Sequence, residues 1–191
     1  MESAFHFVFE LFKIAALAAV YSCVILLLYR GFSREKYKKV VLRQGKARLW
    51  LKLYLLFYAG LFIFMFTYWG NHGLGDSAQI PVGHFTTMQN INWTAYATLD
   101  DREFSNGDPI QTTAFIVYDD RVLGNCESDF YSPAYKYFIY DLDSRDLVEF
   151  PDEATFTAFT ARHKLPGSKD LKSFEENYSD YWRGWRFWLL P

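Results

Sequence analysis

The sequence predicts a membrane protein, in which an N-terminal transmembrane hairpin of two helices precedes a small extracytoplasmic α+β domain. Three features indicate this fold class: two apolar runs near the N-terminus, a basic stretch between them, and a polar C-terminal part in which strand patterns precede helix patterns. We expect the hairpin to cover residues 1–70, a linker to cover 71–76 and the domain to cover 77–191.

Each apolar run has about the length that a membrane span requires. A helix needs roughly 20 apolar residues to cross the hydrocarbon core, and spans are predicted at about 9–28 and 53–69. The first span contains two charged residues, Glu10 and Lys13, and the second contains none. A spacing of three places Glu10 and Lys13 on one helix face. We expect them to pair near the outer boundary, where both side chains can reach water.

Small residues predict how the two spans pack. Ala59 and Gly60 are the only small residues of the second span. Small side chains let helix backbones approach closely in a membrane. We therefore expect this pair to face the alanine-rich stripe of the first span, which consists of Ala15, Ala16, Ala18 and Ala19. The same stripe could dock the helix of a partner.

The stretch 30–52 predicts the orientation, because it holds nine Lys or Arg residues against one acid, Glu35. Short loops rich in Lys and Arg stay on the cytoplasmic side. Residues 1–70 hold ten basic and three acidic groups, whereas residues 71–191 hold ten basic and nineteen acidic ones. We expect the basic side chains to set the topology, and the alternative is that they also form a surface for anionic lipid head groups. They are Arg30, Arg34, Lys36, Lys38, Lys39, Arg43, Lys46, Arg48 and Lys52.

This topology predicts an integral protein of a bacterial inner (plasma) membrane, with the N-terminus and the C-terminal domain on the non-cytoplasmic side. The expected partners are the membrane and another protein, in or outside the membrane. The formation of a homo-oligomer is a further possibility that the sequence leaves open. Nucleic-acid binding is not expected, because Tyr37 and Trp50 are the only aromatics within the basic stretch that could stack on bases, apart from those at its edges.

The C-terminal part predicts one antiparallel sheet covered by two helices. Alternating and apolar patterns predict strands, and a turn-rich Asp143 to Asp146 predicts a hairpin. Asp152 is expected to cap the first helix, and Ser168 or Asp170 to start the second. The predicted strands cover 92–98, 112–118, 135–142 and 147–150.

The C-terminal sequence from Trp182 to Pro191 contains three Trp and two Leu residues. Three interpretations remain open: a core segment of the domain, a segment on the membrane surface whose Arg residues meet lipid phosphates, and a docking peptide for a partner protein. Trp and Arg often dominate interface energetics. The interface candidates are Trp182, Arg183, Trp185, Arg186 and Trp188.

The sequence carries no pattern of a known metal or catalytic site. The four histidines have spacings that match no zinc motif, and no nucleophile elbow, metalloprotease or dinucleotide fingerprint occurs. We expect no metal, cofactor or catalytic residues. If the protein were an enzyme, His84, Asp141 and His163 would be the first candidates. Cys126 is expected to be buried, since Cys23 lies within a span.

These patterns favour a membrane-anchored, non-enzymatic accessory or interaction protein whose acidic outer domain binds another protein. One alternative is a sensor or small-ligand module that signals through the hairpin, and another is a membrane-bound enzyme. The sensor would need an aromatic pocket in the domain. Its candidate lining residues are Trp93, Tyr96, Tyr118 and Tyr137.

Overall fold

The computed structural model describes residues 2–32, 34–70, 77–92, 94–104, 107–126 and 135–191. The predicted linker 71–76 lies outside the described residues. The chain divides into a helical unit, Met1–Gly75 with Gly184–Pro191, and an α+β unit, Asp76–Arg183. The segment 184–191 thus groups with the helices, although the sequence placed it with the domain.

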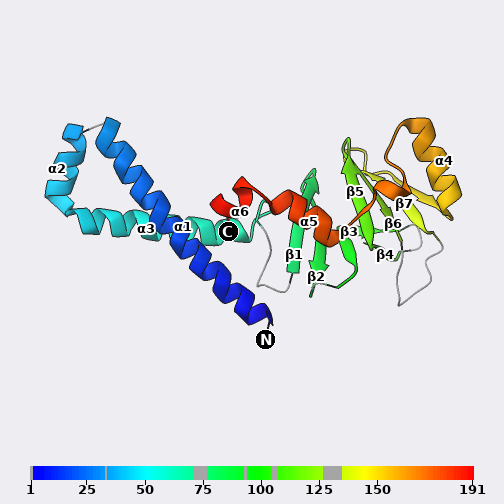
Figure 1. Ribbon diagram of the computed structural model, residues 1–191, viewed down its shortest axis with the longest axis horizontal. Helices are drawn as coiled ribbons and strands as arrows, with labels where there is room; N and C mark the ends of the chain where they lie inside the picture. Colours follow the sequence, from blue (N-terminus) through cyan, green and yellow to red (C-terminus); the bar gives the residue numbers. More distant parts are fainter. Residues whose placement is uncertain (1, 33, 71–76, 93, 105–106, 127–134) are drawn as a thin grey trace. The chain divides into compact units, whose positions relative to one another are not determined.

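Two long apolar helices, α1 (Glu2–Phe32) and α3 (Lys46–Met65), pack against each other in the helical unit (Figure 1). Both are long and apolar enough to cross a membrane. Side chains with polar tips help to join them. Tyr21 packs edge-to-face on Phe57 with ring centroids 5.8 Å apart, and the indole N–H of Trp50 donates to Cys23 Sγ at 3.4 Å.

The helix packing differs from the prediction. Ala59 is exposed, and a Cβ added at Gly60 would meet no atom within 4 Å. The small pair therefore does not form the contact, and aromatic rings such as Phe57 and Trp50 do so instead. In addition, α3 ends at Met65, four residues before the predicted end of the second span.

The basic stretch is helical for most of its length. It comprises the last turn of α1, the helix α2 (Arg34–Gln44) and the first turns of α3. Tyr29 of α1 packs edge-to-face on Tyr37 of α2, with centroids 6.0 Å apart. Figure 1 shows α2 at the end of the hairpin, between α1 and α3.

The α+β unit contains two antiparallel sheets, where the sequence predicted one. The first has the strand order β1-β2-β3-β4 and the second the order β8-β7-β6-β5-β9. The first sheet comprises β1 (Ser77–Gly83), β2 (Thr86–Ile91), β3 (Ala97–Glu103) and β4 (Pro109–Thr112). The second comprises β5 (Ala114–Tyr118), β6 (Arg121–Asn125), β7 (Tyr137–Asp141), β8 (Leu147–Phe150) and β9 (Lys172–Ser173).

The second sheet contributes to two apolar clusters. Alternate residues along a strand point to opposite faces, so Val122 of β6 joins one cluster and Leu123 joins the other. The larger cluster combines both sheets with Phe174 of α5 (Phe174–Trp182). The smaller cluster lies under α4 (Glu153–His163) and contains Phe156.

Several local predictions are confirmed. The strands β7 and β8 form the expected hairpin. Asp152 caps α4, because its carboxylate accepts the N–H of Thr155 at 2.8 Å. Cys126 is buried, with 3% of its surface exposed.

Two elements of the α+β unit begin several residues later than predicted. The strand predicted from residue 92 begins at Ala97, because Asn92 has a positive φ of 57° and Asn90 donates to the carbonyls of Thr94 and Tyr96. The helix predicted from Ser168 or Asp170 begins at Phe174. Ser168–Asp170 form a short 3₁₀ turn instead, and Ser173 makes the capping box of α5.

Candidate functional site

Three tight turns of the α+β unit meet at one place. The imidazole of His84, between β1 and β2, has Nε2 3.6 Å from an Asp120 carboxylate oxygen, in the turn between β5 and β6. Its Nδ1 is 4.0 Å from a carboxylate oxygen of Asp143, in the turn between β7 and β8. We call His84, Phe85, Asp119, Asp120 and Asp143 the turn cluster. It joins the ends of the two sheets.

The turn cluster has an unusual backbone. His84 and Phe85 have φ values of 49° and 59°, and Asp119 and Asp120 have 45° and 56°. Two-residue hairpin turns of type I′ require positive φ at both central residues and favour Asn and Gly. Asp adopts this region with little strain, but a bulky residue is an outlier there. The backbone at Phe85 is therefore strained.

Phe85 is also the most exposed large apolar side chain in the described part of the α+β unit, at 77%. The preceding residue, His84, is the one whose side chain lies near Asp120 and Asp143. The strained backbone reduces stability and the exposed ring adds little to it, whereas a Gly or Asn at this position would close the hairpin without strain. The alternation of Ala78, Ile80 and Val82 before His84 indicates a strand, but the sequence of the turn itself does not indicate a hairpin.

Asp141, one of the enzyme candidates, organises the β7–β8 turn. One carboxylate oxygen accepts the N–H groups of Ser144 at 3.0 Å and Asp143 at 3.2 Å, and the other pairs with Arg121 at 3.0 Å. The Ser144 N–H, ahead of Asp143 and Arg121, holds the pKa of Asp141 below its ordinary value. Its hydrogen-bonding capacity is largely used by the turn.

The three enzyme candidates do not form one site in the described part of the chain. His84 and Asp141 belong to neighbouring turns, whereas His163 stacks on Phe159 of α4 with centroids 4.2 Å apart. Among the described residues, no group of three or more His, Cys, Asp or Glu side chains is arranged to hold a metal ion.

The aromatic positions proposed for a ligand pocket are also separated. Tyr118 is opposite Arg121, and Tyr137 is opposite Asn125, so these two lie at opposite ends of the second sheet. Tyr137 stacks on Phe156 at 4.8 Å. Tyr96 precedes β3 in the first sheet, and Trp93 lies outside the described residues.

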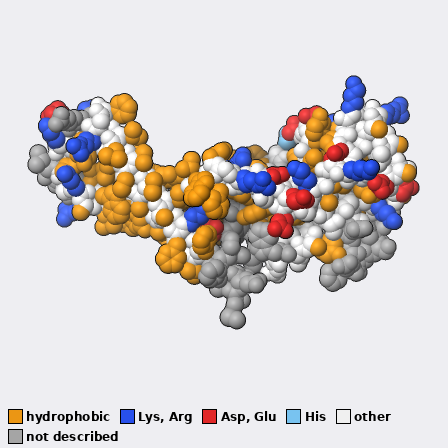
Figure 2. Space-filling view, viewed as in Figure 1, with side chains coloured by type: hydrophobic (Ala, Val, Ile, Leu, Met, Phe, Trp, Pro, Cys, Tyr) orange, Lys and Arg blue, Asp and Glu red, His pale blue; other side chains and the backbone are white. Residues whose placement is uncertain are grey.

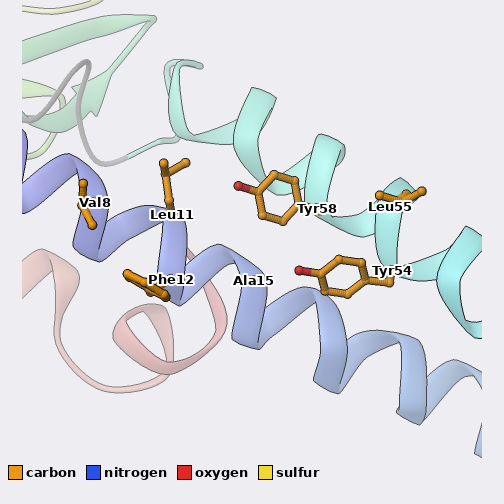
Figure 3. Close-up of a pocket in the computed structure, with 7 residues that line it drawn as sticks. All are labelled: Val8, Leu11, Phe12, Ala15, Tyr54, Leu55 and Tyr58. Carbon is orange, nitrogen blue, oxygen red and sulfur yellow. The ribbon is translucent and has the colours of Figure 1, made fainter.

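The helical unit instead has an apolar groove of about 490 Å³ between α1 and α3. Figure 3 shows the rings of Tyr54 and Tyr58 between the two helices. The other lining residues are Val8, Leu11, Phe12, Ala15 and Leu55.

The basic residues form an exposed surface at the α2 end of the hairpin. Figure 2 shows their side chains gathered over α2, next to an apolar surface over α1 and α3. Lys38 pairs with Glu35 at 3.3 Å. Only the backbones of Arg34 and Arg43 are described. The exposed side chains are Arg30, Lys36, Lys38, Lys39, Lys46, Arg48 and Lys52.

The five C-terminal interface candidates divide between the two units. Trp182 is buried in the α+β unit, where its indole N–H donates to the Gln79 carbonyl at 3.1 Å. Arg183 pairs with Asp180 at 3.1 Å in the same unit. The other three, Trp185, Arg186 and Trp188, belong to α6 (Trp185–Leu189) in the helical unit.

Helix α6 packs on α1. The hydroxyl of Tyr21 donates to the carbonyl of Leu189, and the ammonium of Lys13 is 5.1 Å from the centroid of the Phe187 ring. Lys13 also lies 4.0 Å from the carboxylate of Glu10. Glu10 is only 3% exposed, and its Oε2 makes no hydrogen bond. The pair expected at the water boundary is thus mostly buried.

No protein-family model, curated protein or solved structure matches the chain.

Proposed function

We propose that the chain is a two-span membrane protein whose α+β domain binds another protein on the non-cytoplasmic side, without catalysing a reaction. The length and composition of α1 and α3 support the membrane anchor. The exposed basic surface at α2 supports a cytoplasmic position for the connection between them, because Lys and Arg in short connections are retained inside.

The backbone conformation and the exposure of Phe85 are the observations that support the binding function. The positive φ of Phe85 costs stability, and a ring that is 77% exposed gains little from burial in return. Strained backbone of this kind is concentrated at functional sites, where surrounding structure holds it in place. Here His84 and Asp120 link the turn to its neighbours. Phe85 therefore acts as an apolar anchor for a partner.

The charge around Phe85 defines the chemistry of this partner. Asp119, Asp120, Asp143 and Asp146 lie in the two turns nearest to His84, and all four are exposed. Residues 71–191 carry nineteen acidic and ten basic groups. Complementary charge steers association and selects partners. The partner should offer an apolar pocket for the Phe85 ring with Lys or Arg side chains around it.

A photo-crosslinking amino acid at Phe85 tests this proposal in the full-length protein in its own cells. We expect one protein adduct of discrete mass. The same crosslinker at Val148, which is 40% exposed on β8, should give none. Replacing Asp120→Lys and Asp143→Lys should lower the adduct yield. No adduct at position 85, or equal adducts from both positions, would refute the binding site.

The orientation has its own test with a maleimide that cannot cross membranes. Cys23→Ser removes one thiol, and the second, Cys126, is buried. In this background, Ser144→Cys should be labelled on whole cells with a permeabilised envelope. Lys38→Cys should be labelled only after the inner membrane is opened. The reverse pattern would overturn the proposed topology.

A further inference from the structure

We propose that α6 is inserted into the outer half of the membrane beside α1, where Trp185 and Trp188 contact lipid. This inference rests on the proposed function, because it requires α1 to cross the membrane. It makes the C-terminal aromatic segment a further membrane anchor, in addition to the two spans.

The position of α6 along α1 is the first argument. It contacts α1 at Lys13 through Phe187 and at Tyr21 through Leu189. A helix rises about 1.5 Å per residue, so these two contact positions are about 12 Å apart along α1. Both lie inside the apolar helix Phe7–Phe32. A segment resting above the membrane would contact only the end of this helix.

The hydrogen bonding of α6 is the second argument. The last carbonyl groups of a helix have no partner within the helix. In hydrocarbon such a group is costly unless a neighbour satisfies it. The Tyr21 hydroxyl of α1 donates to the carbonyl of Leu189, the last residue of α6. A phenol from an apolar helix thus satisfies the last carbonyl of α6 without water.

The exposed side chains are the third argument. Trp185 is 60% exposed, Phe187 50%, Trp188 72% and Leu189 46%. On α1, Phe12 is 73% exposed. Exposed apolar side chains of a helix that crosses the membrane are covered by lipid. Helix α6 packs on α1 through Lys13 and Tyr21, within this apolar helix. Trp is enriched where acyl chains meet head groups. Lipid is therefore the environment that fits all of these side chains.

The Glu10–Lys13 pair is the fourth argument. A charge within a membrane span is costly unless it is paired or covered. The carboxylate of Glu10 is nearly buried, and the Lys13 ammonium lies over the face of Phe187. An aromatic face attracts a cation, most strongly where water is excluded. Insertion of α6 thus covers Lys13 where α1 enters the membrane.

Electron paramagnetic resonance of a nitroxide label tests the insertion in the full chain, reconstituted into liposomes of phosphatidylethanolamine and phosphatidylglycerol. Labels are placed singly through Trp188→Cys, Trp185→Cys, Leu27→Cys and Ser144→Cys, with Cys23→Ser as background. Oxygen concentrates in lipid and a nickel chelate concentrates in water. Leu27 is 66% exposed on α1, and Ser144 is exposed in the α+β unit, so they provide the two references.

We expect the ratio of oxygen to nickel accessibility at 188 and 185 to be severalfold higher than at 144 and close to that at 27. A water-like ratio at 188 and 185, with a lipid-like ratio at 27, would overturn the insertion and leave the anchor intact. Exclusion of both reagents at 188 and 185 would indicate a protein contact and would also overturn it. A water-like ratio at 27 would refute the membrane anchor itself.

A second measurement uses the Tyr21→Phe variant with the label at position 188. The C-terminal sequence is otherwise unchanged. Loss of the hydroxyl removes the donor to the Leu189 carbonyl, so the nickel accessibility at 188 should rise. Tyr54→Phe is the matched control, since Tyr54 lies in the groove away from this hydrogen bond. An equal change in both variants, or none in Tyr21→Phe, would contradict the role of Tyr21.

Discussion

The side-chain oxygen of Asn125 accepts the main-chain N–H of Ala114 at 2.8 Å, and it also accepts the N–H of Thr113 at 3.1 Å. Asn125 ends β6, whereas Thr113 separates β4 of the first sheet from β5 of the second. One amide group therefore holds the point at which the chain leaves one sheet and enters the other.

Asn125→Ala should destabilise the α+β unit. It removes the acceptor of two main-chain N–H groups at a half-buried position, and an unsatisfied group of this kind costs about 1–3 kcal/mol. The free energy of unfolding is measured on the full chain in mild detergent, from the near-ultraviolet circular dichroism. Asn125→Asp keeps an acceptor oxygen and should lose less. Equal losses for the two variants would contradict the assigned role of this oxygen.

Phe85→Asn should stabilise the fold, although it is expected to remove binding. Asn adopts positive φ more readily than Phe, and the change also removes an exposed apolar ring. The free energy of unfolding should rise by about 1 kcal/mol. Phe85→Leu keeps both the apolar character and the backbone strain, so it should leave stability nearly unchanged. A destabilised Phe85→Asn would show that the ring supports the fold, and would weaken the argument for a binding role.

Local sequence patterns were sufficient where a short segment determines its own structure. The β7–β8 hairpin follows from the polar turn at Asp143 to Asp146, and α4 follows from the cap at Asp152. Both depend on interactions within a few residues. The two apolar helices were predictable for a different reason, because a long continuous run of apolar residues is visible in the composition alone.

The turn cluster and the division into two sheets could not be predicted locally. The β1–β2 turn is His84-Phe85, which lacks the Asn or Gly of a type I′ turn, and β1 contains Pro81, which argues against a strand except at a sheet edge. The break at Thr113 depends on Asn125, twelve residues away. Contacts between distant residues decide these features.

The stability of the protein should fall at alkaline pH because of the buried thiol of Cys126. Burial, followed by the charge of Glu149, raises the pKa of this thiol from 9.0 to about 12. The folded state therefore favours the neutral thiol, and its contribution to stability is full below the unfolded pKa. It is lost as the pH rises from 9.0 towards about 12, because the unfolded chain ionises first.

Unfolding of the full chain at a series of pH values in this window checks the prediction. The Cys126→Ala variant starts from a lower stability, because it leaves a cavity, but its free energy of unfolding should fall less steeply with pH. Cys23→Ala removes the other thiol, which lies on α1 outside this core, and should keep the parent slope. Identical slopes for the parent and Cys126→Ala would refute the pKa shift.

Gly124→Ala should destabilise the second sheet by overpacking its core. A Cβ at this position would lie 2.7 Å and 2.8 Å from two ring carbons of Phe138, and 3.0 Å from Oγ1 of Thr112. Phe138 is completely buried, so its ring cannot move aside. Overpacking of this kind costs about 1–3 kcal/mol. The free energy of unfolding of the full chain provides the measurement.

Gly167→Ala is the matched control in the same unit, since the nearest atom to its added Cβ is 3.8 Å away and its φ of −91° suits any residue. It should change stability little. A smaller ring at the contact should relieve the clash, so Phe138→Leu should destabilise less in the Gly124→Ala background than in the parent. Additive effects would show that Gly124 and Phe138 are not coupled, and that the loss in Gly124→Ala arises elsewhere.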